Sequence, residues 1–188
     1  MNYSDYLDLQ KKKTTDPIRR SKWLNEEWGL KLGGFSRIFA QNQEYAQGKS
    51  LCIGARTGQE VQALIDQGNE AVGIDLVAQK PLVLEGDFHD LDFEDSVFDF
   101  VFSNVVDHAL YPDKFCSEMV RVLKPKGFAL IHLQVNVPDD EYGVHEITDL
   151  ESGFMQYLPT NTRLVKNVSI SHSEFATFNR EVVIQKTA

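Results

Sequence analysis

Residues 51–60 read LCIGARTGQE, and this stretch decides the fold. The apolar run 50–54 predicts a buried strand that breaks at Gly54, and residues 58–68 have the apolar spacing of a helix followed by a glycine stop. A strand, a turn with glycines and a helix in succession are typical of α/β proteins that hold a nucleotide-like ligand. Arg56 is unusual in such a turn, because its side chain stands where backbone normally approaches the ligand.

Downstream of this stretch, apolar runs alternate with helical patterns, which is typical of an α/β sheet. After the first strand we expect a helix at 111–127 and strands at 70–75, 81–87, 97–104, 128–135, 162–170 and 174–186. The last two strands read as a hairpin joined by the residues SHS. Within the strand 97–104, alternation predicts Phe98, Phe100 and Phe102 on one face.

Composition and charge exclude several classes of protein. Of the 188 residues, 42% are apolar and 25% charged, which is typical of one ordinary globular domain. No apolar run has the length of a membrane span, and the N-terminus does not resemble a secretory signal, so we expect a cytoplasmic protein without a membrane partner. The net charge of −9 argues against broad nucleic-acid binding.

Two smaller features concern metal binding and the basic N-terminal stretch. The two cysteines are too few for a disulfide framework or a cysteine-rich zinc site, and no histidine has ligand spacing, so we expect no metal. The basic stretch 11–22 is either a solvated, mobile terminus or a contact for an anionic substrate.

In a parallel sheet of this type, ligands bind beyond the carboxyl ends of the strands. Asp75 ends the second strand and is able to accept hydrogen bonds from the two hydroxyls of a ribose. Asp87 follows the third strand and is able to accept from the exocyclic amine of adenine, with Phe88 covering the base. The plainer alternatives are a turn without a ligand, a surface aspartate, and a loop acid beside a core phenylalanine.

These residues carry a resemblance to a known family. The segments LCIGARTGQE, LEGDFHDLDFED, FDFVFSN and RVLKPKG resemble a class I S-adenosylmethionine-dependent methyltransferase of the small-molecule type, over about residues 50–133, and GARTGQEV resembles plant-type members without an assigned substrate. The resemblance implies a Rossmann-like, doubly wound, seven-stranded sheet. It is mostly parallel, with the antiparallel last strand inserted between strands five and six. A helical N-terminal extension 1–49 precedes the cofactor-binding core 50–135, and the substrate-side loop and C-terminal hairpin occupy 136–188.

The resemblance also implies S-adenosylmethionine as the cofactor and assigns its binding residues. These are Gly54, Arg56, Thr57 and Gly58 toward the methionine end, Asp75 and Leu76 at the ribose, Asp87 and Phe88 at the adenine, and Ser103 and Asn104 beside the sulfonium.

The sequence departs from the family pattern at two positions of the loop. The family usually has an acid where this chain has Cys52, and a glycine where it has Arg56. Arg56 either clamps the methionine carboxylate through a two-pronged pair, or pairs with Glu60, or fills the pocket and prevents cofactor binding.

The expected reaction is methyl transfer to a small organic acceptor. Asp107 and His108 follow the fourth strand and are the candidate general bases, with His108 preferred because its ordinary pKa lies near neutral pH; a structural role for this histidine is the alternative. Aromatic residues of the helical front and of the loop 136–159 would flank the acceptor. A non-catalytic, methyltransferase-like binding or scaffold protein remains the rival. A nicotinamide-dependent enzyme is disfavoured, because the loop lacks the third glycine of G-x-G-x-x-G.

Overall fold

The computed structural model describes residues 1–138, 141–175 and 177–188 of the chain. Residues 139 and 140, in the expected loop 136–159, and residue 176, in the expected strand 174–186, lie outside the described residues. The elements follow one another as α1 (Tyr3–Thr15), α2 (Pro17–Ser21), the π-helix η1 (Lys22–Glu26), α3 (Trp28–Gln41), β1 (Lys49–Ile53), α4 (Gln59–Asp66), β2 (Glu70–Asp75), β3 (Val83–Glu85), β4 (Phe98–Ser103), η2 (Val106–His108), α5 (Pro112–Val122), β5 (Leu123–Leu133), α6 (Leu150–Gly153), η3 (Met155–Tyr157), β6 (Thr162–Ser169), η4 (Ser173–Phe175) and β7 (Arg180–Lys186).

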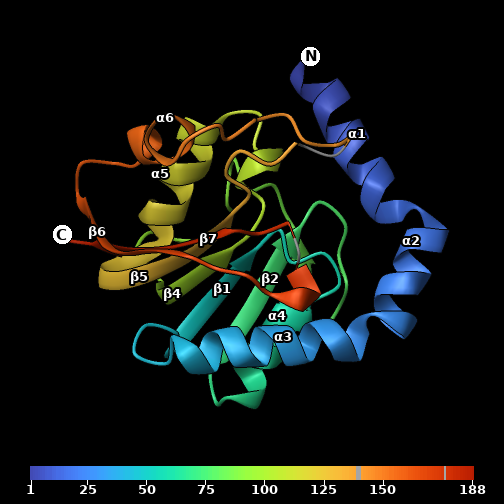
Figure 1. The fold of residues 1–188 in the computed structure, drawn as a ribbon, viewed down its shortest axis with the longest axis horizontal. Coiled ribbons are helices and arrows are strands. Elements are labelled where there is room, and N and C mark those ends of the chain that lie inside the picture. The colour runs from blue at the N-terminus through green and yellow to red at the C-terminus, as the bar shows by residue number, and fades with distance from the viewer. Residues whose placement is uncertain (139–140, 176) are drawn as a thin grey trace.

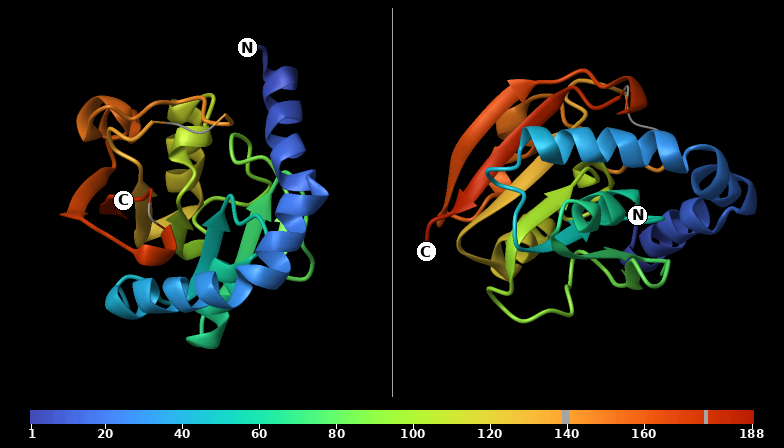
Figure 2. Two further views of the ribbon diagram at one scale, coloured as in Figure 1. Left: turned by 45° about the vertical axis from the view of Figure 1, so that its right-hand side comes forward. Right: turned by 90° about the horizontal axis from the view of Figure 1, so that it is seen from below.

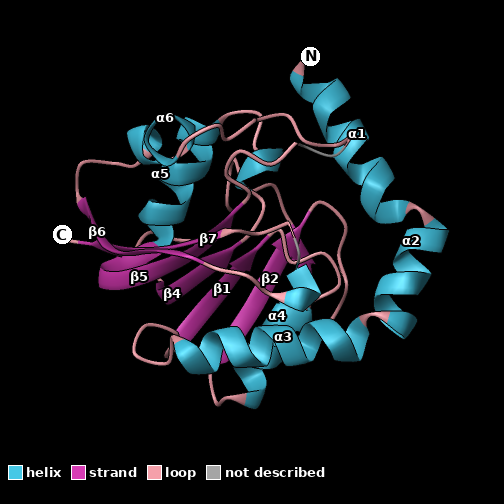
Figure 3. Cartoon of the chain, in the orientation of Figure 1, coloured by secondary structure: helices cyan, strands magenta, loops and turns pink. Residues whose placement is uncertain are grey.

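The strands form one seven-stranded sheet in the order β3-β2-β1-β4-β5-β7-β6 (Figure 3). Strands β1 to β5 pair in parallel, whereas β7 runs antiparallel to both β5 and β6. The last strand is therefore inserted between β5 and β6, and the expected Rossmann-like sheet with an antiparallel last strand is confirmed.

Helices cover both faces of the sheet (Figure 1), and alternation along the strands supplies a core to each face. On one face Leu51 and Ile53 of β1 pack in the same core as Phe115 of α5. On the other face Cys52 packs in the same core as Phe39 of α3. All are almost fully buried, and burial of each large apolar side chain stabilises the fold by about 1.5–3 kcal/mol.

The helical N-terminal extension is confirmed, and it reaches the functional edge of the sheet. Helix α3 packs beside α4, and α1 and α2 wrap around toward the ends of β1 and β2 (Figures 1 and 2). The side chains of Asn2 and Asp16 cap α1 and α2 by accepting hydrogen bonds from backbone N–H groups in the first turn of each helix. The basic stretch 11–22 is therefore helical, and Lys13 within it is only 8% exposed. In the described part of the chain, no helix is long and apolar enough to cross a membrane.

A buried polar group ties β7 to its neighbours. The Glu181 carboxylate accepts from Lys166 Nζ at 2.7 Å and from Asn42 Nδ2 at 3.2 Å, and lies 3.0 Å from His132 Nε2. Burial favours the neutral acid, but these hydrogen bonds and charges outweigh it and lower the pKa of Glu181 to about 2.

The helix expected at 111–127 is too long at its C-terminal end. Helix α5 ends at Val122, and β5 begins at the next residue, because Leu123 pairs with Phe98 of β4 and Pro125 is unable to continue a helix. The same pairing has a register shift between Phe98 and Phe100. As a result Phe98 belongs to the core on the α5 face and Phe100 to the core on the α3 face, so the prediction that they share a face is wrong.

The strand expected at 174–186 is also wrong at its start. Strand β7 begins at Arg180, and the short helix η4 precedes it. The cause is tertiary: the Phe175 ring of η4 packs 4.6 Å from the Phe35 ring of α3, measured between centroids, so this segment covers α3 instead of extending the hairpin.

Candidate functional site

The turn after β1 adopts a backbone conformation that glycine makes possible. Gly54 and Gly58 have φ of +75° and +93°. A Cβ at Gly54 would lie 2.5 Å from Val105 Cγ2, so a side chain is excluded there. Arg56 also has a positive φ, of +45°, a conformation that costs a non-glycine residue about 1 kcal/mol or more. Backbone strain of this kind is often found at functional sites.

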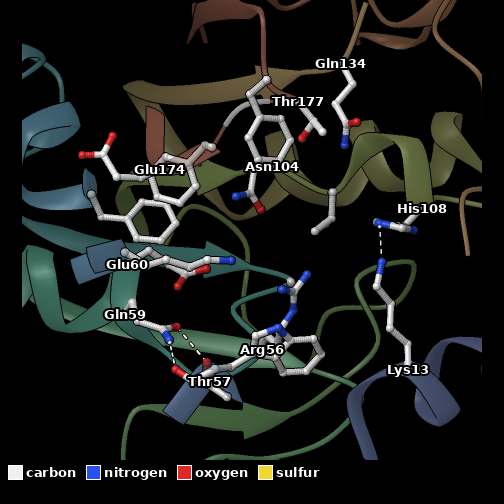
Figure 4. A pocket seen from close by; sticks show the side chains of 17 residues that line it. Lys13, Arg56, Thr57, Gln59, Glu60, Asn104, His108, Gln134, Glu174 and Thr177 are labelled. Carbon is white, nitrogen blue, oxygen red and sulfur yellow. Dashed lines mark hydrogen bonds between the residues drawn. The ribbon is translucent and has the colours of Figure 1, made fainter. Parts of the chain in front are cut away.

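The side chain of Arg56 is held by an aromatic ring and points into the site (Figure 4). Its guanidinium carbon lies 4.3 Å from the centroid of the Trp23 ring. Trp23 is held in turn, because its carbonyl accepts from Gln59 Nε2 at 3.1 Å, and Gln59 Oε1 accepts from Thr57 Oγ at 2.7 Å. No ion pair joins Arg56 to Glu60, both of which lie within the described residues, so the structure lacks the second arrangement considered for Arg56.

A cavity of about 260 Å³ opens beside this turn. Charged, polar and aromatic side chains surround it: Lys13, Lys31, Arg56, Thr57, Gln59, Glu60, Asn104, His108, Gln134, Glu174, Thr177, Trp23, Phe35, Phe175 and Phe178 (Figure 4). A smaller recess of about 40 Å³ shares part of this wall and extends to Gln10, Thr14, Asp75, Leu76 and Phe88. The structure thus brings together most of the site residues predicted from the sequence.

Asp75 closes the turn from the end of β2. One carboxylate oxygen accepts from the Arg56 backbone N–H at 3.0 Å, and the other from the Val77 backbone N–H at 3.3 Å. Burial raises the pKa of Asp75, although these hydrogen bonds and nearby arginines act against it. The carboxylate therefore binds the turn and faces the smaller recess.

Asp87 is covered by α1. The Tyr3 hydroxyl donates to one of its oxygens, and the His89 backbone N–H donates to the other at 2.8 Å. The Tyr3 ring stacks on Tyr111 with centroids 5.6 Å apart. Burial alone would raise the pKa of Asp87, but the hydrogen bonds from His89 and Tyr3 lower it. Phe88, 9% exposed, lines the smaller recess, so Asp87 and Phe88 face different surroundings.

The two candidate bases lie together in η2. His108 Nδ1 lies 3.1 Å from the Tyr142 carbonyl, to which it donates, leaving Nε2 as the acceptor. Lys13 Nζ lies 3.3 Å from this Nε2, and Asp107 Oδ2 lies 3.5 Å from it. Asp107 is buried and accepts from Gln134 Nε2 at 3.2 Å. Only His108 of the two lines the cavity.

The remaining predicted residues separate into two groups. Asn104 lines the cavity, whereas the hydroxyl of fully buried Ser103 donates to the Ile53 carbonyl and lies outside the lining. Cys52, where the family pattern has an acid, is fully buried, and burial together with the charge of Glu60 raises the pKa of its thiol.

Sequence reasoning overlooked Lys31 and Glu60 as cavity residues, and it considered Lys13 only as part of the basic stretch 11–22. Glu60 is 5% exposed, and burial, only partly offset by Arg56, raises its pKa to about 7. The available signal for Glu60 was its position: an acid that comes soon after a glycine turn and stands at the start of an otherwise buried helix. The two lysines reach the site only through the path of α1 and α3.

Comparisons with known proteins agree with this geometry. The family described as "Methyltransferase domain" matches residues 51–131. The 1,6-didemethyltoxoflavin-N1-methyltransferase of Burkholderia thailandensis, solved with its substrate and S-adenosylhomocysteine, is 16% identical with a TM-score of 0.72, over 100% of this chain and 92% of the other. A protein from Pyrococcus horikoshii OT3 is 16% identical with a TM-score of 0.69, over 100% of both chains. A Methanosarcina mazei S-adenosylmethionine-dependent methyltransferase is 16% identical with a TM-score of 0.63, over 79% of this chain and 97% of the other.

No curated protein matches the chain in sequence. The range matched by the family model nevertheless includes the glycine turn, Asp75, Asn104 and His108. Residues 51–131 match the methyltransferase-domain family, and the chain shares its fold with methyltransferases of known structure, whose cofactor is S-adenosylmethionine. The resemblance inferred from the sequence is thereby confirmed.

Proposed function

We propose that this protein transfers a methyl group from S-adenosylmethionine to a small organic acceptor. The observation that carries the proposal is the convergence of the glycine turn, Asp75 and Arg56 on the cavity and the recess beside it, at the carboxyl ends of β1, β2 and β4. The alternative of a non-catalytic scaffold is not favoured, because an open and strongly polar cavity remains at this edge.

The residues fit the methionine and ribose parts of the cofactor. Gly54 leaves room for close backbone approach, Arg56 offers a guanidinium to a carboxylate, and Asp75 keeps acceptor capacity toward ribose hydroxyls. The recess on the adenine side holds about 40 Å³, whereas small-molecule sites typically span about 300–1,000 Å³. We therefore propose that α1, which covers Asp87 through Tyr3, shifts when the cofactor binds.

The acceptor is expected to be small, with a flat apolar body and polar edges. Phe35, Phe175 and Phe178 supply apolar walls, and the amides of Asn104 and Gln134 offer hydrogen bonds. The neighbour from Burkholderia thailandensis acts on a molecule named 1,6-didemethyltoxoflavin, and a compound of similar size suits the space beside Arg56.

Catalysis by this chain would consist of alignment and proton removal. When bound, the cofactor supplies an electrophilic methyl group, so the protein mainly holds the acceptor in line with it. His108 Nε2 is the proposed proton acceptor, because Nδ1 is committed to the Tyr142 carbonyl. The Lys13 ammonium lies against His108 Nε2 in this arrangement. Its side chain therefore has to turn toward the acceptor or solvent before His108 is able to accept a proton.

Replacing Arg56 with glycine tests the cofactor site. Glycine relieves the positive φ and removes the guanidinium. If Arg56 clamps the carboxylate, S-adenosylhomocysteine should bind Arg56→Gly about 10- to 150-fold more weakly in calorimetry, equivalent to about 1.5–3 kcal/mol for a charged hydrogen-bonded contact. Tighter binding by the variant would instead identify Arg56 as a block.

The control is Arg163→Ala, which removes an arginine of β6 that contacts Gln185 rather than the cavity. It should leave the affinity unchanged, and NAD should not bind either protein. Transfer of a labelled methyl group to members of a panel of small heterocycles, amines and phenols then tests the reaction. Binding of the cofactor without transfer to any acceptor would favour the scaffold alternative.

A further inference from the structure

Glu60 presents a buried carboxyl group to the cavity without a side-chain partner. It is 5% exposed and lines the cavity together with Arg56 and Lys31. Among the described residues, its only hydrogen bond is to its own backbone N–H at the start of α4. A buried carboxyl group usually has a hydrogen-bonding or ionic partner, because its charged form is costly to desolvate.

The cationic neighbours of Glu60 are committed elsewhere. Lys31 Nζ pairs with Glu27 at 3.1 Å, and the Arg56 guanidinium rests over the Trp23 ring. Both act on Glu60 through space, without an ion pair. The wall of the cavity therefore carries a guanidinium and, when Glu60 is ionised, a carboxylate, four residues apart in the chain and without an ion pair between them.

Opposite charges held apart on one wall match a ligand that carries both charges itself. A simple anion would be attracted by Arg56 and repelled by Glu60, and a simple cation would meet the reverse. An α-amino acid group has its ammonium and its carboxylate on one carbon atom, so both of its charges are able to find a partner. The methionine part of the proposed cofactor is such a group.

We propose that Glu60 binds the ammonium of the methionine part while Arg56 binds its carboxylate, so that the two residues together recognise the zwitterion. The inference rests on the proposed function and adds to it a residue that determines specificity at the amino acid end. Because Glu60 would have to be ionised to bind the ammonium, binding near neutral pH should release a proton. The titratable and charged groups that face Glu60 are Arg56, Asp75, Lys31 and Cys52.

Calorimetry with ligands trimmed at the amino acid end tests the proposal. The ligands are S-adenosylhomocysteine, its analogue without the amino group, and 5′-methylthioadenosine, which lacks the whole amino acid part. Each is titrated into the wild-type chain, Glu60→Gln and the control Glu70→Gln, whose side chain is 79% exposed on β2. Titrations at pH 6.5 in buffers with different heats of ionisation measure proton release.

The expected result is a loss of affinity confined to the ligand that carries the ammonium. Glu60→Gln should bind S-adenosylhomocysteine about 10- to 100-fold more weakly, the range for a charge-assisted hydrogen bond. It should bind 5′-methylthioadenosine as the wild type does and bind the deaminated analogue no more weakly. Proton release should be present in the wild type and in Glu70→Gln and absent in Glu60→Gln. Loss of the amino group should weaken binding to the wild type, a comparison that needs no variant.

Different failures have different meanings. If the wild type binds S-adenosylhomocysteine but Glu60→Gln binds it equally well, or loses affinity for all three ligands alike, the assignment of Glu60 is wrong while the proposed function stands. If the wild type binds none of the three ligands, the proposed function and this inference fall together.

Discussion

Replacing Glu60 with glutamine is expected to stabilise the folded protein, and the gain should depend on pH. Burial raises the pKa of this carboxyl from 4.5 to about 7 in the folded chain. The folded state therefore keeps a proton that the unfolded state has already released, and wild-type stability falls as the pH rises through this interval. At about 1.4 kcal/mol for each pH unit between the two pKa values, the full cost is about 3 kcal/mol.

The measurement is the free energy of unfolding in urea at several pH values between 4.5 and 8, for the wild type and Glu60→Gln. Near the lower limit the two proteins should be almost equally stable, because the glutamate is neutral in the folded state and only half ionised in the unfolded state. The variant should gain steadily up to about pH 7 and hold an advantage of about 3 kcal/mol above it. The difference between the two proteins cancels the titration of groups that the substitution leaves unaffected.

The exposed Glu70 serves as the control, because replacing it with glutamine should produce no gain that grows with pH. A difference between wild type and Glu60→Gln that is constant across the range would refute the reasoning, as would a variant less stable than the wild type at pH 8. A buried ionisable side chain that serves ligand binding is expected to cost stability, so removing it should stabilise the fold.

Three further predictions concern other parts of the molecule. Gly73→Ala should destabilise the fold by about 1–3 kcal/mol in urea unfolding, because its Cβ would lie 2.5 Å from Ala55 Cβ; an unchanged midpoint would contradict this. Tyr3→Phe frees an oxygen of Asp87, so S-adenosylhomocysteine should bind about two- to tenfold more tightly in calorimetry, and weaker binding would show that α1 does not compete with the ligand. Glu181→Gln should lower stability by about 3 kcal/mol at pH 6, because hydrogen bonds outweigh burial and hold the folded pKa near 2. A carboxyl group with a lowered folded pKa stabilises the folded state at pH values above 4.5. The stability deficit of Glu181→Gln should therefore shrink as the pH falls toward 2, and a deficit independent of pH would contradict the assignment.

The position of Arg56 illustrates how far local reasoning reaches. Its place in the glycine turn indicated a departure from the family pattern, and three arrangements were compatible with the residues, the carboxylate clamp being preferred. The structure lacks the pair with Glu60 and places the guanidinium over Trp23, 33 positions earlier in the chain. Nothing in the sequence around residue 56 reports that contact, because it depends on where the helices α1 to α3 lead the chain.

By itself, the sequence determined the sheet and the edge at which function lies. Apolar runs separated by helical patterns are local signals, and the glycines after β1 are needed wherever that backbone turn occurs. The strand end at Asp75 was predicted from the same periodicity and agrees with the structure, and β4 ends at Ser103, one residue before the predicted end. Loop positions after those strands therefore converge on one edge without knowledge of side-chain contacts.

Tertiary structure alone decided what those positions face. Tyr3 reaches Asp87, Phe175 packs on Phe35, and Glu60 is enclosed without a partner, and each result depends on segments distant in sequence. Hydrogen bonds and desolvation act over a few ångströms in space rather than along the chain. The sequence thus specified most of the loop residues at the site, and packing added Lys31 and Glu60 and specified which residues are free to meet a ligand.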